Sequence, residues 1–186
     1  WHVIEPNTPY VGGWHVGAVC RHLEAVLAGQ IRQLLLLVPP RMSKSTCTSV
    51  CLPPWPWIKR PSLRFMFASY SDGLSTDLAV TSRRIIDSDY YQARWGHVYQ
   101  LTTDRNIKTN YENTSRGYRI STSRDGTVTG RGADILVLDD PHNLRNIYSA
   151  AERQATRETF YKRSWHNRLN DPEHGRRICI MQRGHP

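Results

Sequence analysis

The chain has 186 residues, of which 39% are hydrophobic and 22% charged, with 25 Lys and Arg against 16 Asp and Glu and a formal charge of +9. This composition excludes an intrinsically disordered tail, and the length suits one compact domain. The longest apolar run, 34–38, is far shorter than the roughly 20 residues that cross a bilayer, so we expect no membrane segment. The excess of Arg leaves two interpretations open, a nucleic-acid partner or a merely basic soluble protein.

The ends of the sequence and its cysteines limit the remaining classes. The first ten residues lack the basic start and apolar centre of a signal peptide, and the first residue is Trp. We therefore expect an internal piece of a longer protein, truncated at both ends. Four cysteines form no CxxC pair, which favours buried, reduced thiols over a zinc site or a disulfide framework.

The first half of the chain alternates between helical and strand patterns. Apolar residues recur at helical spacing over 16–27, and a continuous apolar run at 33–38 is typical of a strand buried on both faces. A cluster of Pro and Trp follows at 52–57, and 63–69 predicts a second buried strand. Asp72 is expected to cap a helix that runs to about residue 86.

The second half continues the alternation. The pattern predicts a short strand at 118–122, a Gly-rich loop at 126–132 and an apolar strand at 135–138. An alternating-charge helix is expected within 149–168 and a further strand at 177–181. Strands that alternate with helices predict an α/β fold with a mostly parallel sheet flanked by helices, whose active edge lies at the carboxyl ends of the strands.

The strand at 33–38 is followed by PPRMSKST, residues 39–46. In a phosphate-binding P-loop, a Lys lies beside the β- and γ-phosphates and the next Ser or Thr binds magnesium, as Lys44 and Ser45 would here. The standard pattern has Gly where this chain has Val38 and Ser43. The motif alone therefore leaves open a surface lysine at the start of a helix.

The strand at 135–138 ends on an acidic pair in ILVLDD. A Walker B element needs one carboxylate that holds magnesium and a second that activates the attacking water, which indicates Asp139 for the metal and Asp140 for the base. An ordinary Asp-Pro turn is the alternative. Because Lys-Ser follows one buried strand and Asp-Asp follows another, the two motifs together predict a nucleotide site.

Two further segments carry polar residues with open interpretations. Arg131, in TGRGAD, is placed to contact DNA phosphate, to reach a neighbouring subunit's γ-phosphate as an arginine finger, or to be solvated in a tight turn. Arg41 is the next candidate for the finger. Gln182 and Arg183 follow the last strand, where they would sense the γ-phosphate or simply end the strand.

The ordered series EPNTPYVGGWH, HLEAVLAG, PPRMSKST, SYS, YEN, TGRGADILVLDDP, RLNDP and MQRGH resembles the ATPase part of the terminase large subunit of tailed bacteriophages. The resemblance covers essentially the whole chain. It implies a single P-loop NTPase domain of the RecA type over 1–186, with the Walker A loop in PPRMSKST, 39–46, and Walker B at Asp139. The expected nucleotide-binding residues are Arg41, Met42, Ser43, Lys44, Ser45, Thr46 and Gln182, and adenine is expected near Tyr10, Trp14 or His15.

The resemblance also implies a biological role. A motor of this family uses ATP and Mg²⁺ to drive double-stranded DNA into a procapsid, as a ring of identical subunits on the portal protein, together with a small terminase subunit, in the host cytoplasm. The RNase H-like nuclease domain of the family would lie beyond this chain, so we expect no nuclease activity here. Two alternatives remain, a helicase-like DNA-dependent ATPase and a degenerate P-loop domain that binds DNA without hydrolysis.

Overall fold

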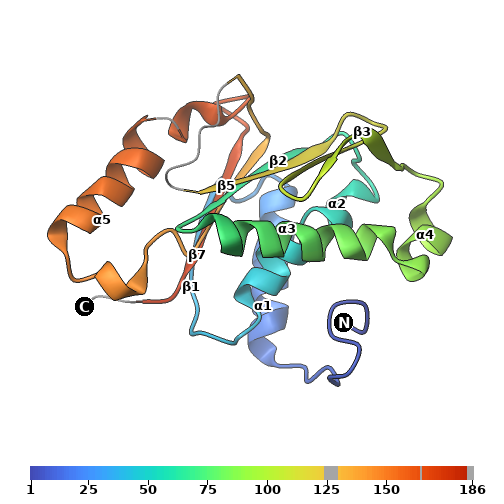
Figure 1. The fold of residues 1–186 in the computed structure, drawn as a ribbon, viewed down its shortest axis with the longest axis horizontal. Coiled ribbons are helices and arrows are strands. Elements are labelled where there is room, and N and C mark those ends of the chain that lie inside the picture. The colour runs from blue at the N-terminus through green and yellow to red at the C-terminus, as the bar shows by residue number, and fades with distance from the viewer. Residues whose placement is uncertain (124–129, 164, 184–186) are drawn as a thin grey trace.

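The computed structural model describes residues 1–123, 130–163 and 165–183 and contains one seven-stranded sheet (Figure 1). The strand order is β1-β7-β6-β2-β5-β4-β3. The strands are β1 (Gln33–Leu37), β2 (Arg64–Ser69), β3 (Leu101–Ile107), β4 (Asn110–Asn113), β5 (Tyr118–Ser123), β6 (Ile135–Asp139) and β7 (Arg176–Met181). Strands β1, β7, β6, β2 and β5 are parallel to one another. Strand β4 runs antiparallel to β5, and β3 runs antiparallel to β4. The mostly parallel α/β sheet predicted from the sequence is confirmed.

Helices and short helical turns cover both faces of this sheet (Figure 1). The α-helices are α1 (Trp14–Leu27), α2 (Pro54–Trp57), α3 (Asp72–Asp87), α4 (Asp89–Trp95) and α5 (Ala150–Arg157). The π- and 3₁₀-helical segments are η1 (Thr46–Cys51), η2 (Leu144–Asn146), η3 (Glu158–Arg163) and η4 (His166–Arg168). Within the described ranges, no helix has both the length and the apolar character needed to cross a membrane.

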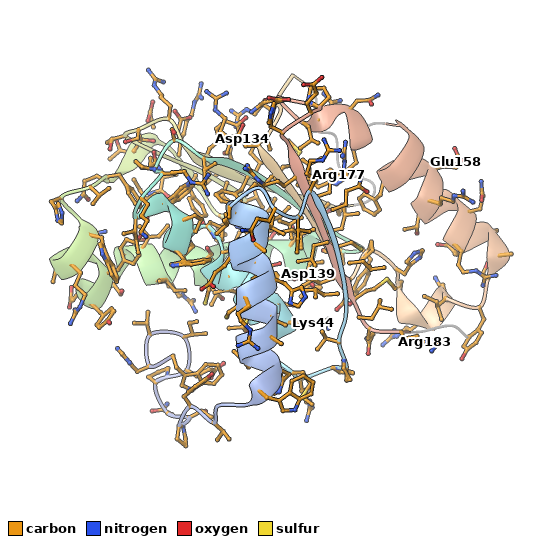
Figure 2. The ribbon with its side chains drawn as sticks, turned by 180° about the vertical axis from the view of Figure 1, so that it is seen from behind. Lys44, Asp134, Asp139, Glu158, Arg177 and Arg183 are labelled. Atoms are coloured by element: carbon orange, nitrogen blue, oxygen red, sulfur yellow. The ribbon has the colours of Figure 1, made fainter. Side chains whose placement is uncertain are left out.

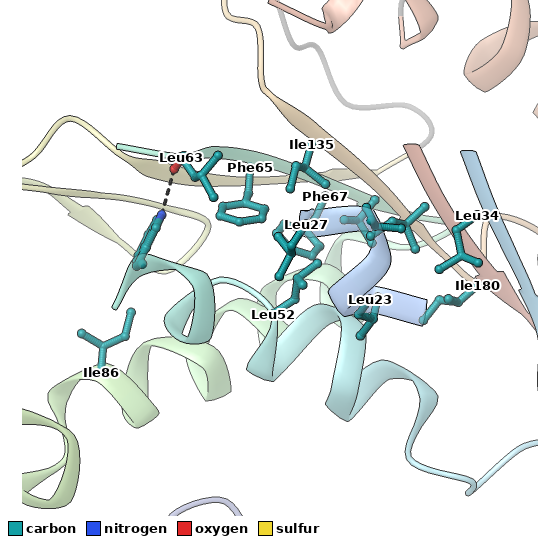
Figure 3. Close-up of a cluster of buried hydrophobic side chains, with 14 of the residues drawn as sticks. Leu23, Leu27, Leu34, Leu52, Leu63, Phe65, Phe67, Ile86, Ile135 and Ile180 are labelled. Atoms are coloured by element: carbon teal, nitrogen blue, oxygen red, sulfur yellow. Dashed lines mark hydrogen bonds between the residues drawn. The ribbon is translucent and has the colours of Figure 1, made fainter. Parts of the chain in front are cut away.

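The core forms two apolar layers because β6 is apolar at every position before its final aspartate. Ile135 and Val137 point to the face covered by α1 to α4, where they join Phe65, Phe67 and Trp57 (Figure 3). The alternate residues of β6 belong to the second layer, with Phe160 and Trp165 of the C-terminal helical segment. Burial on both faces explains why the apolar runs at β2 and β6 show no polar alternation. Apolar packing on both faces of the sheet therefore fixes the positions of the strands and of the loops that follow them.

Several local predictions need correction. The N-cap of α3 is Ser71 rather than Asp72, because the Ser71 hydroxyl accepts a hydrogen bond from the Leu74 amide at 3.2 Å. The charged helix expected within 149–168 is divided into α5, η3 and η4. The helix α4 and the hairpin β3–β4 were not predicted. Of the Gly-rich loop expected at 126–132, residues 126–129 lie outside the described residues.

Candidate nucleotide-binding site

The carboxyl ends of the parallel strands bring the two sequence motifs together. Strand β7 lies between β1 and β6, with Leu37 paired to Met181 on one side and Ile180 paired to Asp139 on the other. The helical segment that begins at Lys44 therefore starts at the same edge at which β6 ends. Figure 2 shows Lys44 and Asp139 close together, beside α1.

The loop between β1 and Lys44 has an unusual backbone. Arg41 has φ 61° and Ser43 has φ 57°, both in the left-handed region that favours glycine. Ser43 occupies the position at which the standard P-loop has its second Gly, so the conformation of a glycine is present although the residue is not. Asp140 is a third case, with φ 45°. Strained backbone of this kind concentrates at functional sites.

The Asp139 carboxylate is held by two serine hydroxyls from the helix that follows the loop. Ser45 Oγ donates to Oδ1 at 2.9 Å, and Ser49 Oγ donates to Oδ2 at 2.5 Å. Asp139 is only 2% exposed. Burial raises its pKa to about 6, the neighbouring Asp140 carboxylate adds to the rise, and the bonds from Ser49 and Ser45 oppose it. Asp139 is thus a desolvated carboxylate with hydroxyl groups at both oxygens.

Lys44 and Asp140 form an ion pair beside this carboxylate. The Lys44 Nζ lies 3.0 Å from Asp140 Oδ2, and the Lys44 side chain is 9% exposed. The backbone of Asp140 is fixed as well, because its amide donates to the Ile180 carbonyl at 2.9 Å and its carbonyl accepts from the Tyr70 amide at 3.3 Å. The ammonium and this carboxylate are therefore prepositioned at the mouth of the loop.

The donor groups suit magnesium better than a softer metal. Across the described ranges, no cluster of three or more His, Cys, Asp or Glu side chains forms a metal site. Mg²⁺ is commonly held by one or two carboxylates and the phosphates of a nucleotide, with water in the remaining positions. Asp139 and the Ser45 hydroxyl supply hard oxygen donors of that kind, so these residues fit a magnesium ion bound together with a nucleotide.

An apolar cavity of about 490 Å³ opens next to the loop. Residues from the N-terminal segment, α1, the loop, η1 and α2 line it, namely Trp1, Ile4, Tyr10, Val16, Cys20, Leu23, Glu24, Ser43, Thr46, Cys47, Cys51 and Trp55. The rings of Trp1 and Tyr10 contact one another with centroids 5.6 Å apart. Of the three residues expected near adenine, Tyr10 lines the cavity, whereas Trp14 and His15 are not among its lining residues.

The other predicted nucleotide-binding residues lie at or near this edge. Arg41 and Met42 are exposed in the loop, and Thr46 is half-buried between the loop and the cavity. Gln182 is half-buried and directly follows β7, whose last residue accepts a hydrogen bond from the Val38 amide at 3.0 Å. The backbone of Gln182 is thus beside the start of the loop.

Arg131 lies elsewhere. Its Nη1 donates to the Asn110 side chain at 3.2 Å, and its guanidinium lies 5.9 Å from the centroid of the Tyr118 ring. Because Tyr118 begins β5 and Arg131 precedes β6, this contact belongs to the amino edge of the parallel strands. The structure does not bring Arg131 together with Lys44 of its own chain.

Two residues of the site were missed by the sequence reasoning. Ser49 was detectable, since it follows Ser45 by four positions and shares a helix face with it. Arg119 is fully buried in β5, where it donates to the carbonyl of Ser49 at 3.2 Å. No local pattern in the sequence distinguishes Arg119 from the solvated arginines.

Comparisons with known proteins agree with this arrangement at the level of the fold. No family model and no curated protein matches the sequence. Among solved structures, the chain is similar to the large terminase of bacteriophage HK97, with a TM-score of 0.58 and 9% identity over 96% of this chain and 34% of that one. It is also similar to the N-terminal domain of the DNA packaging ATPase of bacteriophage phi29, with a TM-score of 0.53 and 11% identity over 84% of this chain and 76% of that one.

These similarities concern the fold, and the chain spans about a third of the HK97 large terminase. Within that limit, they agree with the family resemblance drawn from the ordered sequence motifs. The chain therefore has the fold shared by the HK97 large terminase and the N-terminal domain of the phi29 packaging ATPase.

Proposed function

We propose that this chain binds and hydrolyses ATP with Mg²⁺ and acts as the motor domain of a terminase-like DNA-packaging machine. One observation carries the proposal. Lys44, Ser45, Asp139 and Asp140 come from motifs about ninety residues apart in the sequence, yet their side chains are bonded to one another at one sheet edge. A phosphate-binding lysine, a metal-binding hydroxyl and two carboxylates are the groups that phosphoryl transfer requires.

The ion pair suggests how the chemistry would begin. A nucleotide phosphate would compete with Asp140 for the Lys44 ammonium, since both are anionic oxygens within reach of the same group. Asp140 would then be released to orient water and accept its proton. Ser45 and Asp139 would hold the magnesium, which neutralises charge on the phosphates when bound.

The cavity beside the loop is the proposed site for the adenine base. Its volume, about 490 Å³, lies in the usual range for small-molecule pockets, and its walls are mostly apolar with aromatic rings from the N-terminal segment. Tyr10 is the proposed stacking residue, and Thr46 links the cavity to the phosphate loop. Gln182 is proposed to sense the γ-phosphate, because it follows the strand between the loop and Asp139.

The partners follow from the names of the similar proteins and from the charge. A large terminase and a DNA packaging ATPase act on DNA, and a chain with a formal charge of +9 suits a double-stranded DNA partner. We extend this to a ring of identical subunits on a portal protein, with a small terminase subunit, in the host cytoplasm. Nuclease activity is not part of the proposal.

DNA-stimulated ATP turnover tests the proposed function. We expect the chain to release phosphate from ATP in the presence of Mg²⁺, and double-stranded DNA to increase the rate. DNA binding without any phosphate release, in a folded protein that also binds no nucleotide, would instead support a degenerate domain. A preference for single-stranded over double-stranded DNA would support a helicase-like ATPase.

Arg131 is proposed to act on a neighbouring subunit, because it lies at the edge opposite to its own Lys44. An Arg131→Ala subunit and a Lys44→Ala subunit, each inactive alone, should recover part of the turnover when mixed under conditions that allow assembly. In a mixed ring some interfaces join an intact loop to an intact arginine. No recovery, together with weaker DNA binding and a salt slope lower by about one, would assign Arg131 to DNA instead.

A further inference from the structure

Two buried polar residues, Ser49 and Arg119, extend the site beyond the groups that would touch the nucleotide. Ser49 lies in η1 and is 1% exposed, and Arg119 lies in β5 and is fully buried. The proposed hydrolysis uses neither residue directly. Their contacts nevertheless lead to Asp139, the proposed magnesium carboxylate.

Ser49 and Ser45 bind different oxygens of the same carboxylate. Ser45 Oγ lies 2.9 Å from Oδ1 of Asp139, and Ser49 Oγ lies 2.5 Å from Oδ2. The two serines are four positions apart, so their hydroxyls project from successive turns of one helical segment. With a donor at each oxygen, the carboxylate cannot rotate about its own axis without breaking a hydrogen bond.

The two hydroxyls have different surroundings. Ser45 is half-buried at the start of the helical segment, where it is also the proposed magnesium ligand. Ser49 lies about one turn further along the segment and is almost fully buried. Its bond to Asp139 therefore does not depend on whether Ser45 engages a metal. Residues behind a metal ligand commonly set its orientation and are needed for full metal affinity.

Arg119 holds the turn that carries Ser49. Its guanidinium stacks on the Phe67 ring at 4.1 Å from the centroid, donates to the Ser121 hydroxyl, and donates from Nη2 to the Ser49 carbonyl at 3.2 Å. In the part of the chain that the structure describes, no carboxylate forms an ion pair with Arg119. The guanidinium is therefore held by backbone, hydroxyl and aromatic contacts, which fix η1 against β2 and β5. Its buried Nε finds no hydrogen-bond partner among the described residues.

We propose that Ser49 is a positioning residue that orients Asp139 for magnesium, and that Arg119 keeps Ser49 in place from the neighbouring strand. The inference rests on the proposed function, since it assigns magnesium to Asp139. It adds that metal affinity is set partly by a serine that touches neither metal nor nucleotide.

The test is a magnesium titration of nucleotide binding, which requires no turnover. Binding of a fluorescent, non-hydrolysable ATP analogue is measured in EDTA and then at increasing Mg²⁺. For Ser49→Ala we expect the Mg²⁺ concentration at half-maximal effect to rise by roughly 10-fold or more, the range for loss of an outer-shell partner. The affinity for the analogue in EDTA should stay within about twofold, because Lys44 and the loop are unchanged.

Thr48→Val is the matched control. Thr48 neighbours Ser49 and is fully buried, but its hydroxyl donates to the Lys44 carbonyl at 2.8 Å and not to Asp139. Ser49→Cys is a second test variant that nearly preserves volume and replaces the hydroxyl with a weak donor. It should show the same direction of shift as Ser49→Ala. Arg119→Lys should also raise the Mg²⁺ requirement, since one ammonium cannot reproduce the three contacts of the guanidinium. The shift should be smaller than for Ser49→Ala, because Arg119 acts on Asp139 only through Ser49.

The outcomes separate this inference from the proposed function. A wild-type chain that binds the analogue with magnesium dependence, combined with unchanged magnesium dependence in both Ser49 variants, would overturn the positioning role alone. Equal shifts in Thr48→Val and Ser49→Ala would overturn it too, because a general loosening of η1 would explain both. A wild-type chain that binds no nucleotide would instead refute the proposed function.

Discussion

Strand β6 begins beside Asp134 and ends on Asp139, which Asp140 follows, so one strand presents carboxylates at both edges of the sheet (Figure 2). At the amino edge, Asp134 accepts hydrogen bonds from the Arg64 amide at 2.9 Å and from the Asn170 side chain at 2.8 Å. At the carboxyl edge, the two aspartates bind serine hydroxyls and the Lys44 ammonium.

The difference lies in the partners rather than in the carboxylates. A backbone amide and an asparagine side chain can only hold Asp134 in place. A hydroxyl can also bind a metal, and an ammonium can exchange a carboxylate for a phosphate. The carboxyl edge is also strained at Ser43 and Asp140, and it buries Asp139 almost completely. The carboxyl edge therefore gives up stability for exchangeable contacts, as functional sites often do.

Replacement of aspartate by asparagine should give the largest difference in ATP turnover between the two edges. Asp140→Asn should lower ATP turnover by roughly 10² to 10⁴, because an amide cannot accept a proton from water. Nucleotide affinity should change little. Asp134→Asn is the control and should keep turnover within about twofold, since its partners are structural. If Asp140→Asn instead abolishes magnesium dependence while Asp139→Asn keeps turnover, the roles of the two aspartates are reversed.

Asp139→Asn tests whether burial of this carboxylate costs stability. Its pKa is raised from 3.8 to about 6 in the folded chain, so the folded state binds the proton more tightly than the unfolded state. The wild type therefore loses stability as the pH rises from about 4 to 6. Asparagine carries no charge, so we expect Asp139→Asn to be more stable than the wild type by about 3 kcal/mol at pH 7.

The pH dependence supplies the control for this prediction. The stability difference should shrink as the pH falls from 6 to 4, since the wild-type carboxyl is then neutral in the folded chain. Chemical denaturation of both proteins at pH 7 and pH 4 measures it. An Asp139→Asn variant that is less stable than the wild type at pH 7 would show that the serine bonds outweigh the cost of burial.

Removal of a cation at each edge should change nucleotide affinity less than Asp140→Asn changes turnover. Lys44→Ala should weaken nucleotide binding by about tenfold or more, because a phosphate loses its charged partner. Arg131→Ala should leave the nucleotide affinity of a single chain within about twofold, because Arg131 contacts Asn110 and Tyr118 at the opposite edge. Titration with the ATP analogue measures both. Equal losses would contradict the division between the edges.

The sequence predicted the parts of the fold that are apolar and continuous. Strands β2, β6 and β7 lie inside the sheet, and each appears as an apolar run with clear bounds. Strand β1 is also an apolar run, but the expectation that it is buried on both faces was wrong. It is the edge strand, and Leu35 and Leu37 are 60% and 54% exposed. Lys-Ser and Asp-Asp were identified because each directly follows such a run. By contrast, β3 is largely exposed and has the sequence LTTDRNI, which lacks an apolar alternation. It pairs only with β4 at the edge of the sheet.

Contacts between distant strands were not predictable from local pattern. The pairing of β7 between β1 and β6 decides that Lys44 meets Asp140, and strand order is a property of the whole sheet. The positive φ of Ser43 explains why the missing glycine does not abolish the loop shape, but a serine in the sequence gives no sign of it. Arg119 is buried by the same tertiary packing. The sequence therefore predicted which residue types follow the strands, but not how the sheet brings them together.

A crystal structure of the chain with Mg²⁺ and a non-hydrolysable ATP analogue tests the proposed nucleotide site most directly. We expect the phosphates to lie along residues 41–45, with Lys44 bound to a phosphate oxygen instead of Asp140. The metal should lie at Ser45 and Asp139, and the base in the cavity lined by Tyr10. Nucleotide bound away from this edge, or a Lys44–Asp140 ion pair that persists with the analogue bound, would refute the proposed site.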